Sequence, residues 1–117
     1  MHARTLFGRE GEDAASAFYR DLGYEVVERN YRSGRGEIDL VARRGETLVF
    51  CEVKSRRSDR WGAPAEAVDG LKQARLRKLA AAWMAERRPG YAEVRFDVVS
   101  VIVRDGKTDV NHIPDAF

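Results

Sequence analysis

Cysteine, long apolar runs and net charge are all scarce in this chain. One Cys in 117 residues, Cys51, rules out a disulfide within the chain, and a reduced, cytoplasmic setting is the simplest expectation. No apolar run is long enough to span a membrane, and the first residues lack the apolar core of a signal peptide, so no membrane partner is expected. Lys and Arg exceed Asp and Glu by only +2. Any affinity for nucleic acid must therefore come from where the basic residues lie.

What the chain does have is a regular succession of helical and strand patterns. A chain of 117 residues suits one domain, residues 1–117. The patterns predict helices over residues 8–22 and 65–87, and strands over 24–31, 36–43, 46–54, 93–103 and 110–113. A helix between strands requires a crossover connection. We therefore expect an α/β fold of order α-β-β-β-α-β-β, with a mixed central sheet, at least one parallel strand pair and helices on both faces.

Residues 36–54, GEIDLVARRGETLVFCEVK, predict a hairpin at the centre of that sheet. With a two-residue turn at Arg44-Gly45, Arg43 would pair with Glu46 and Glu37 with Glu52. Both sides of such a hairpin are apolar, which is typical of a strand pair covered on both faces. By alternation, one face carries Glu37, Asp39, Val41, Leu48, Phe50, Glu52 and Lys54, and the other carries Ile38, Leu40, Val49, Cys51 and Val53.

The charged residues of this hairpin gather at its open end, where they conflict with core packing. Buried charges are expensive unless they are paired or bind a metal. Asp39 lies diagonal to Glu52 in the predicted register, within reach of one shared Mg²⁺. Lys54 points the same way and could hold or deprotonate an attacking water. The alternative is a surface hairpin with weak cross-strand ion pairs, but the apolar opposite face and the additional charges favour a site.

Other charged residues are expected near this site, each with a plainer alternative. Glu12, beside the small residues of the first helix, could lie at the edge of the carboxylate cluster or be a favourable charge in the first helical turn. Lys72 falls within the apolar stripe of the second helix and could reach the cluster or place its ammonium in solvent. Two basic segments could contact phosphate or be solvated links: the first contains Arg32 and Arg35, and the second contains Arg56, Arg57 and Arg60.

The order of these residues resembles a known nuclease pattern. Glu37-Ile38-Asp39-Leu40 followed by Phe50-Cys51-Glu52-Val53-Lys54 resembles the PD-(D/E)XK nuclease superfamily, whose signature is an Asp on one strand and Glu-x-Lys on the next. More closely, the chain is similar to the YraN family of predicted endonucleases, relatives of the archaeal Holliday junction resolvases. The matching segments are Gly11-Glu12, Asn30-Tyr31-Arg32, Gly36-Glu37-Ile38-Asp39, Glu52-Val53-Lys54-Ser55-Arg56, Arg95-Phe96-Asp97, His112-Ile113 and Ala116-Phe117.

This resemblance implies a restriction-endonuclease-like fold and a Mg²⁺-dependent endonuclease, with Mn²⁺ as a substitute, that hydrolyses DNA phosphodiester bonds. Branched or repair and recombination intermediates would be its substrates, and a homodimer is possible because resolvase relatives act as dimers. Its metal ligands would be Asp39, Glu52, Glu12 and the Val53 carbonyl. Lys54 would act on the water, with Glu37, Lys72 and Gln73 in support. The alternatives are a non-catalytic module that binds nucleic acid and a metal-dependent hydrolase with another substrate.

Overall fold

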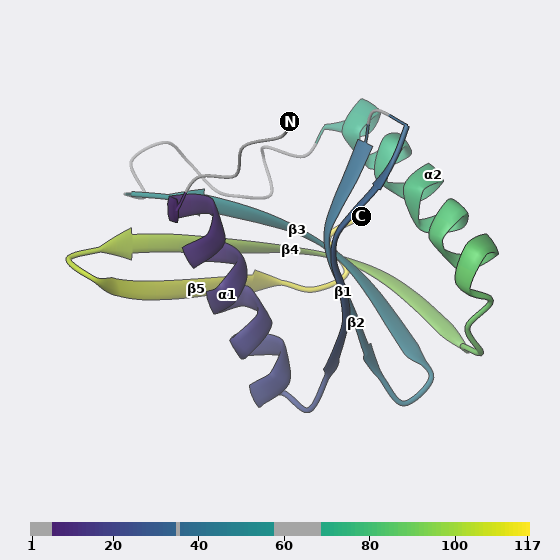
Figure 1. The fold of residues 1–117 in the computed structure, drawn as a ribbon, viewed down its shortest axis with the longest axis horizontal. Helices are drawn as coiled ribbons and strands as arrows, with labels where there is room; N and C mark the ends of the chain where they lie inside the picture. Colours follow the sequence, from purple (N-terminus) through teal and green to yellow (C-terminus); the bar gives the residue numbers. More distant parts are fainter. Residues whose placement is uncertain (1–5, 35, 58–68) are drawn as a thin grey trace.

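A computed structural model describes residues 6–34, 36–57 and 69–117. The predicted order of helix, three strands, helix and two strands is confirmed (Figure 1). Arg35, Arg60 and residues 65–68 of the predicted second helix lie outside the described residues. The elements are α1 (Leu6–Asp21), β1 (Glu25–Ser33), β2 (Gly36–Arg44), β3 (Thr47–Arg56), α2 (Gly70–Arg87), β4 (Glu93–Arg104) and β5 (Lys107–Ile113).

The five strands form one sheet in the order β1-β2-β3-β4-β5. Three neighbouring pairs are antiparallel, and β3 and β4 are parallel because α2 lies between them in the chain. The expected mixed sheet with a crossover helix is therefore confirmed. No helix among the described residues is both long and apolar enough to cross a membrane.

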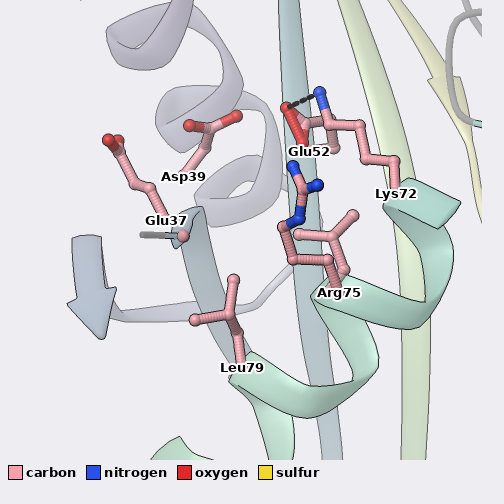
Figure 2. Close-up of a pocket in the computed structure, with 8 residues that line it drawn as sticks. Glu37, Asp39, Glu52, Lys72, Arg75 and Leu79 are labelled. Carbon is pink, nitrogen blue, oxygen red and sulfur yellow. Dashed lines mark ion pairs between the residues drawn. The ribbon is translucent and has the colours of Figure 1, made fainter. Parts of the chain in front are cut away.

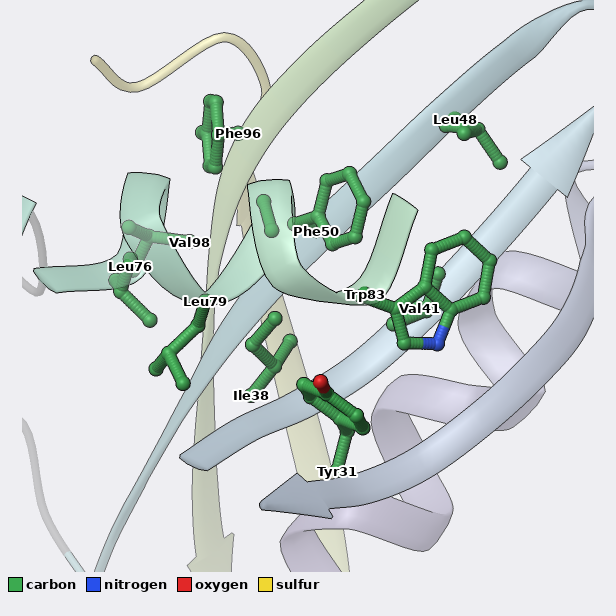
Figure 3. Close-up of a cluster of buried hydrophobic side chains, with 11 residues drawn as sticks. Tyr31, Ile38, Val41, Leu48, Phe50, Leu76, Leu79, Trp83, Phe96 and Val98 are labelled. Atoms are coloured by element: carbon green, nitrogen blue, oxygen red, sulfur yellow. The ribbon is translucent and has the colours of Figure 1, made fainter. Parts of the chain in front are cut away.

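The two helices cover opposite faces of the sheet, each over its own apolar cluster. On the α2 face, Trp83, Leu76 and Leu79 pack on strand residues that include Val41 and Phe50 (Figure 3). On the α1 face, the buried residues are Ala15, Tyr19, Tyr24, Leu40, Ala42, Val49, Cys51, Val99 and Val101. The central strands are thus apolar on both sides, as their composition predicts.

The β2–β3 hairpin has its predicted strands, but the predicted register is wrong by two residues. The turn is Gly45-Glu46 rather than Arg44-Gly45, so Arg44 pairs with Thr47 and Val41 with Phe50. Gly45 has φ 60°, a left-handed conformation that glycine adopts readily and that suits the first position of a tight hairpin turn. Since a shift of two preserves alternation, the residues expected on one face still share a face near the turn.

Alternation fails further along β2, at Asp39. Ile38 packs in the α2-face cluster together with Val41, although strict alternation puts them on opposite faces. The β2–β3 ladder ends at the pair Leu40–Cys51. In the neighbouring strand β1, Asn30 has φ 57° and interrupts the alternation of β1 at the level of Asp39. Asp39 therefore lies where β2 begins to separate from β3.

Within the described residues, the second helix begins at Gly70. Asp69 has extended backbone angles, and its carboxylate accepts a 2.8 Å hydrogen bond from the Lys72 N–H, which makes it the N-cap of α2. The helix ends at Arg87, and the left-handed conformation of its C-cap Arg88 (φ 48°) closes it before Pro89. This start leaves Lys72 in the first turn of α2, close to the open end of the hairpin.

Helix α1 approaches the sheet closely because residue 11 is glycine. A Cβ at Gly11 would lie 1.8 Å from the Ser55 Oγ and 3.0 Å from the Ser55 Cβ. No side chain fits there, so the absence of one allows α1 to contact β3 directly. The next residue, Glu12, is buried as a result, with 3% of its surface exposed.

Candidate functional site

A polar cleft opens where β2 and β3 separate, beside the first turns of α2 (Figure 2). Its volume is about 260 Å³. The strands contribute carboxylates, and α2 contributes two cations and two leucines. The lining residues are Gly36, Glu37, Asp39, Glu52, Lys72, Arg75, Leu76 and Leu79. Two of these residues, Leu76 and Leu79, belong to the packed α2-face cluster and form the apolar wall of the cleft.

Three carboxylates converge at one side of this cleft. Glu12 of α1, Glu37 and Asp39 each offer an oxygen, and these atoms lie within 4.8 Å of one another. Arg29 lies nearby, with its Nη2 3.6 Å from the Glu12 Oε1. A set of carboxylate oxygens at this spacing fits a hard divalent cation such as Mg²⁺, which prefers oxygen ligands. Glu37, expected only as a supporting residue, thus belongs to the closest group of carboxylates.

Asp39 joins this group to Glu52. Its Oδ2 accepts a 2.8 Å hydrogen bond from the Val53 N–H. Burial, followed by the charge of Glu52, raises the pKa of Asp39 to about 8. Since the N–H and C=O of one strand residue point to the same neighbour, the Val53 carbonyl is expected to face the same gap. The gap therefore holds carboxylates whose mutual repulsion a cation would relieve.

Two lysines lie on the other side of Glu52. The Lys72 Nζ is 3.3 Å from the Glu52 Oε1 (Figure 2), so Lys72 reaches the carboxylates rather than solvent alone. Burial and contact with Lys72 lower the pKa of Lys54. Burial acts to lower the pKa of Lys72 as well, but its contacts with Lys54 and Glu52 outweigh this and raise it. Lys72 is therefore the better-held cation and Lys54 the more easily deprotonated amine.

The remaining predicted site residues are placed unevenly. Arg32 is close to the cleft, with its Nη2 3.3 Å from the Glu37 Oε1. Arg56 is half-buried at the end of β3, and Arg57 is exposed just beyond it. Gln73 is in the first turn of α2, where its N–H bonds to the Asp69 carbonyl at 2.9 Å, but it does not line the cleft.

Arg75 is the cleft residue that sequence reasoning missed. The pattern of α2 gave it no more weight than other solvated arginines, yet it lines the cleft beside Glu52 (Figure 2). Its position one helical turn after Lys72 was the available signal, because residues three apart share a helix face. Which face of α2 meets the cleft depends on the packing of Leu76 and Leu79, which the helical period alone does not specify.

Asp97 forms a second polar cluster, in the sheet on the α1 side. It is fully buried and accepts hydrogen bonds from Arg95 at 2.8 and 2.9 Å and from the Tyr19 hydroxyl at 2.8 Å. The His112 Nε2 lies 2.7 Å away, and the Asp115 N–H donates at 3.0 Å. Burial acts to raise the pKa of Asp97, but these bonds outweigh it and lower the pKa. Asp97 is thus paired with basic side chains in the sheet and does not line the cleft.

Fold and site together define a small mixed α/β protein with a carboxylate and lysine cleft at the opening of its central hairpin. The family described as "Uncharacterised protein family UPF0102" matches residues 11–101, a span that contains Glu12 and the three carboxylates that line the cleft. A UPF0102 protein of Frankia casuarinae is 48% identical over 118 residues, covering 100% of both chains. One of Beutenbergia cavernae is 53% identical over 114 residues, 97% of each chain. One of Syntrophomonas wolfei is 44% identical over 110 residues, 94% of this chain and 96% of the relative.

The chain belongs to the UPF0102 family. The resemblance to YraN-type proteins is confirmed as membership of this family.

Proposed function

We propose that this protein is a Mg²⁺-dependent endonuclease of the PD-(D/E)XK superfamily that hydrolyses DNA phosphodiester bonds. The observation that carries the proposal is the convergence of Asp39 and Glu52 with further carboxylates and with Lys72 at one cleft, with Lys54 in contact with Lys72. Buried like charges without a ligand oppose folding, and such conflicts are typical of functional sites. Oxygen-only donors beside amines suit phosphoryl chemistry better than redox or nucleophilic chemistry.

In this proposal, Asp39, Glu52, Glu12 and the Val53 carbonyl hold the metal, with Glu37 as a further oxygen donor. Bound Mg²⁺ supplies a Lewis acid for the phosphate and lowers the pKa of its bound water. Lys54 would orient the attacking water or take its proton, because its lowered pKa makes the neutral amine accessible. Lys72 fixes the orientation of Glu52 through their ion pair.

The substrate would be held mainly through its phosphates. Arg32, Arg35, Arg56, Arg57 and Arg60 flank the hairpin in sequence and supply positive charge without base readout. Apparent affinity should therefore fall steeply between ~50 and ~200 mM salt. A flat salt profile would remove nucleic acid from the proposal. Branched DNA and a homodimer belong to the same proposal, since a four-way junction presents two equivalent strands.

The decisive test compares cleavage and binding in matched variants. Purified protein is incubated with labelled linear, flapped and four-way DNA in Mg²⁺, Mn²⁺ or EDTA. Asp39→Asn should lose Mg²⁺ affinity and cleavage while DNA binding in EDTA is kept or tightened, because a charge that repels phosphate is removed. Lys54→Ala should lose cleavage and keep most Mg²⁺ affinity. Asp109→Asn, an exposed carboxylate on β5, is the control and should match the parent.

The alternative, a non-catalytic module that binds DNA, predicts a different result. The parent would bind DNA and cleave none of the three substrates with either metal, and the Asp39 and Lys54 variants would differ from it only in affinity. Parent-level cleavage by Asp39→Asn would end the proposed mechanism. Replacing the DNA by RNA of the same sequence and shape decides between the two polymers.

A further inference from the structure

Arg75 lines the cleft and, unlike Lys72, Arg32 and Arg29, has no anionic partner among the described residues. Lys72 is paired with Glu52, Arg32 with Glu37, and Arg29 with Asp13. Arg75 is exposed, and within the described part of the chain its guanidinium makes no hydrogen bond or ion pair. The cleft therefore presents one guanidinium whose donors are available for a ligand.

A second hollow continues from Arg75 along α2. It has a volume of about 160 Å³ and is lined by Leu71, Ala74, Arg75 and Lys78. These residues are spaced i, i+3, i+4 and i+7, which puts them on one helix face. Leu71 is 71% exposed, an unusually open position for a leucine, and the exposed Lys78 has no ionic partner among residues 6–34, 36–57 and 69–117. Arg75 belongs to both hollows, so they form a continuous surface.

The chemistry of this surface combines an apolar floor with two cations. A nucleotide has the matching arrangement, because its sugar offers an apolar face and its phosphate a negative charge. The guanidinium fork can bond two phosphate oxygens at once, whereas the lysine acts as a point charge. Acidic residues line the cleft on one side of Arg75, and this face of α2 supplies basic ones on the other.

We propose that Arg75 and Lys78 hold the backbone phosphates of the DNA strand next to the bond at the carboxylates, with a sugar against Leu71 and Ala74. This inference rests on the proposed function and assigns the face of α2 as the track along which the strand enters the cleft. Arg75 fixes the strand at the cleft, and Lys78 extends the contact one helical turn further. Neither residue reads bases, so the track has no sequence preference.

The test measures DNA affinity in EDTA, where no cleavage interferes, as a function of salt. Arg75→Ala should weaken binding about 10- to 100-fold at low salt, equally for unrelated sequences, and lower the slope of log affinity against log salt by about 1. Arg75→Lys should keep the slope and lose part of the affinity. Leu71→Ser should weaken binding with the slope unchanged. Arg20→Ala, an exposed arginine in the last turn of α1, is the matched control and should match the parent.

The outcomes separate this inference from the proposed function. If the parent binds and cleaves DNA and Arg75→Ala has the same DNA affinity as Arg20→Ala, the track is overturned and the enzyme proposal stands. If Arg75→Ala binds DNA more weakly than the parent but with an unchanged salt slope, the track is also overturned. The residue would then act only on the charge of the carboxylates. A parent that binds without cleaving, with the expected Arg75→Ala slope, supports the track while the enzyme proposal fails. No binding by the parent overturns both.

Discussion

Replacing Gly11 by alanine tests whether close packing of α1 positions the site. The added Cβ would lie 1.8 Å from the Ser55 Oγ, 3.0 Å from the Ser55 Cβ and 3.8 Å from the Val101 Cβ. Rotation of the Ser55 hydroxyl relieves the first contact but not the second. The helix must therefore move away from β3, and Glu12 moves with it.

The magnitude follows from two opposing effects. Overpacking of this kind costs about 1–3 kcal/mol, while alanine gains up to ~1 kcal/mol over glycine inside a helix. Gly70→Ala is the matched control, because Gly70 begins α2 and nothing lies within 4 Å of its added Cβ. The free energy of unfolding of Gly11→Ala should thus be about 1–3 kcal/mol below that of Gly70→Ala.

The assay is urea unfolding followed by tryptophan fluorescence, because Trp83 of α2 is buried against the sheet. Adding Ser55→Gly to Gly11→Ala should restore most of the lost stability, since it removes the atoms that clash. Titration calorimetry should show weaker Mg²⁺ binding by Gly11→Ala than by Gly70→Ala, because Glu12 is displaced. If Gly11→Ala is as stable as Gly70→Ala, the proposed role of close packing is refuted.

Three further predictions concern stability. At a pH well above 8, where the Asp39 carboxyl of the metal-free parent is charged because its pKa is about 8, Asp39→Asn should raise the melting temperature, because it removes repulsion from Glu52; an unchanged or lower value by scanning calorimetry contradicts this. Asp97→Asn should cost about 3–5 kcal/mol at neutral pH. Since the folded-state pKa of Asp97 is lowered, the contribution of its carboxylate to stability is complete above the ordinary pKa of 3.8 and lost as pH falls through the folded-state value. Urea unfolding from pH 7 to 2 should therefore show the difference in free energy of unfolding between Asp97→Asn and the parent shrinking. Trp83→Phe removes the 2.9 Å bond to the Glu28 carboxylate and should cost about 1–3 kcal/mol, whereas a parent-like urea midpoint would show that bond to be unimportant.

The order of the elements was predictable because it depends on local pattern. Apolar periodicity and the breaks between segments indicate helix or strand from the local sequence alone. The hairpin register was harder, since it depends on which residue takes the left-handed turn conformation, and Gly45 displaced the turn by one residue. The resulting shift of two kept Asp39 and Glu52 together. A shift of one would have separated them.

The finer arrangement of the site was not predictable from periodicity. Strict alternation describes a regular strand, but β2 is irregular at Asp39, opposite the left-handed Asn30 of β1. Nothing in the sequence specifies that irregularity, which brings Glu37 into the carboxylate group. Arg75 was missed for a related reason, because the rotation of α2 about its axis is set by tertiary packing.

The separation of β2 from β3 links these observations. Beyond Leu40–Cys51 the strands no longer pair, so the Val53 N–H would lack its ladder partner if the Asp39 carboxylate did not accept from it. The same side chain that completes the backbone bonding therefore carries the charge that makes the gap acidic. Apolar clusters on both faces of the sheet hold the strands around this gap and offset the cost of the carboxylates. A ligand that neutralises them stabilises the folded state by mass action, so the melting temperature of the parent, unlike that of Asp39→Asn, should rise with Mg²⁺ concentration.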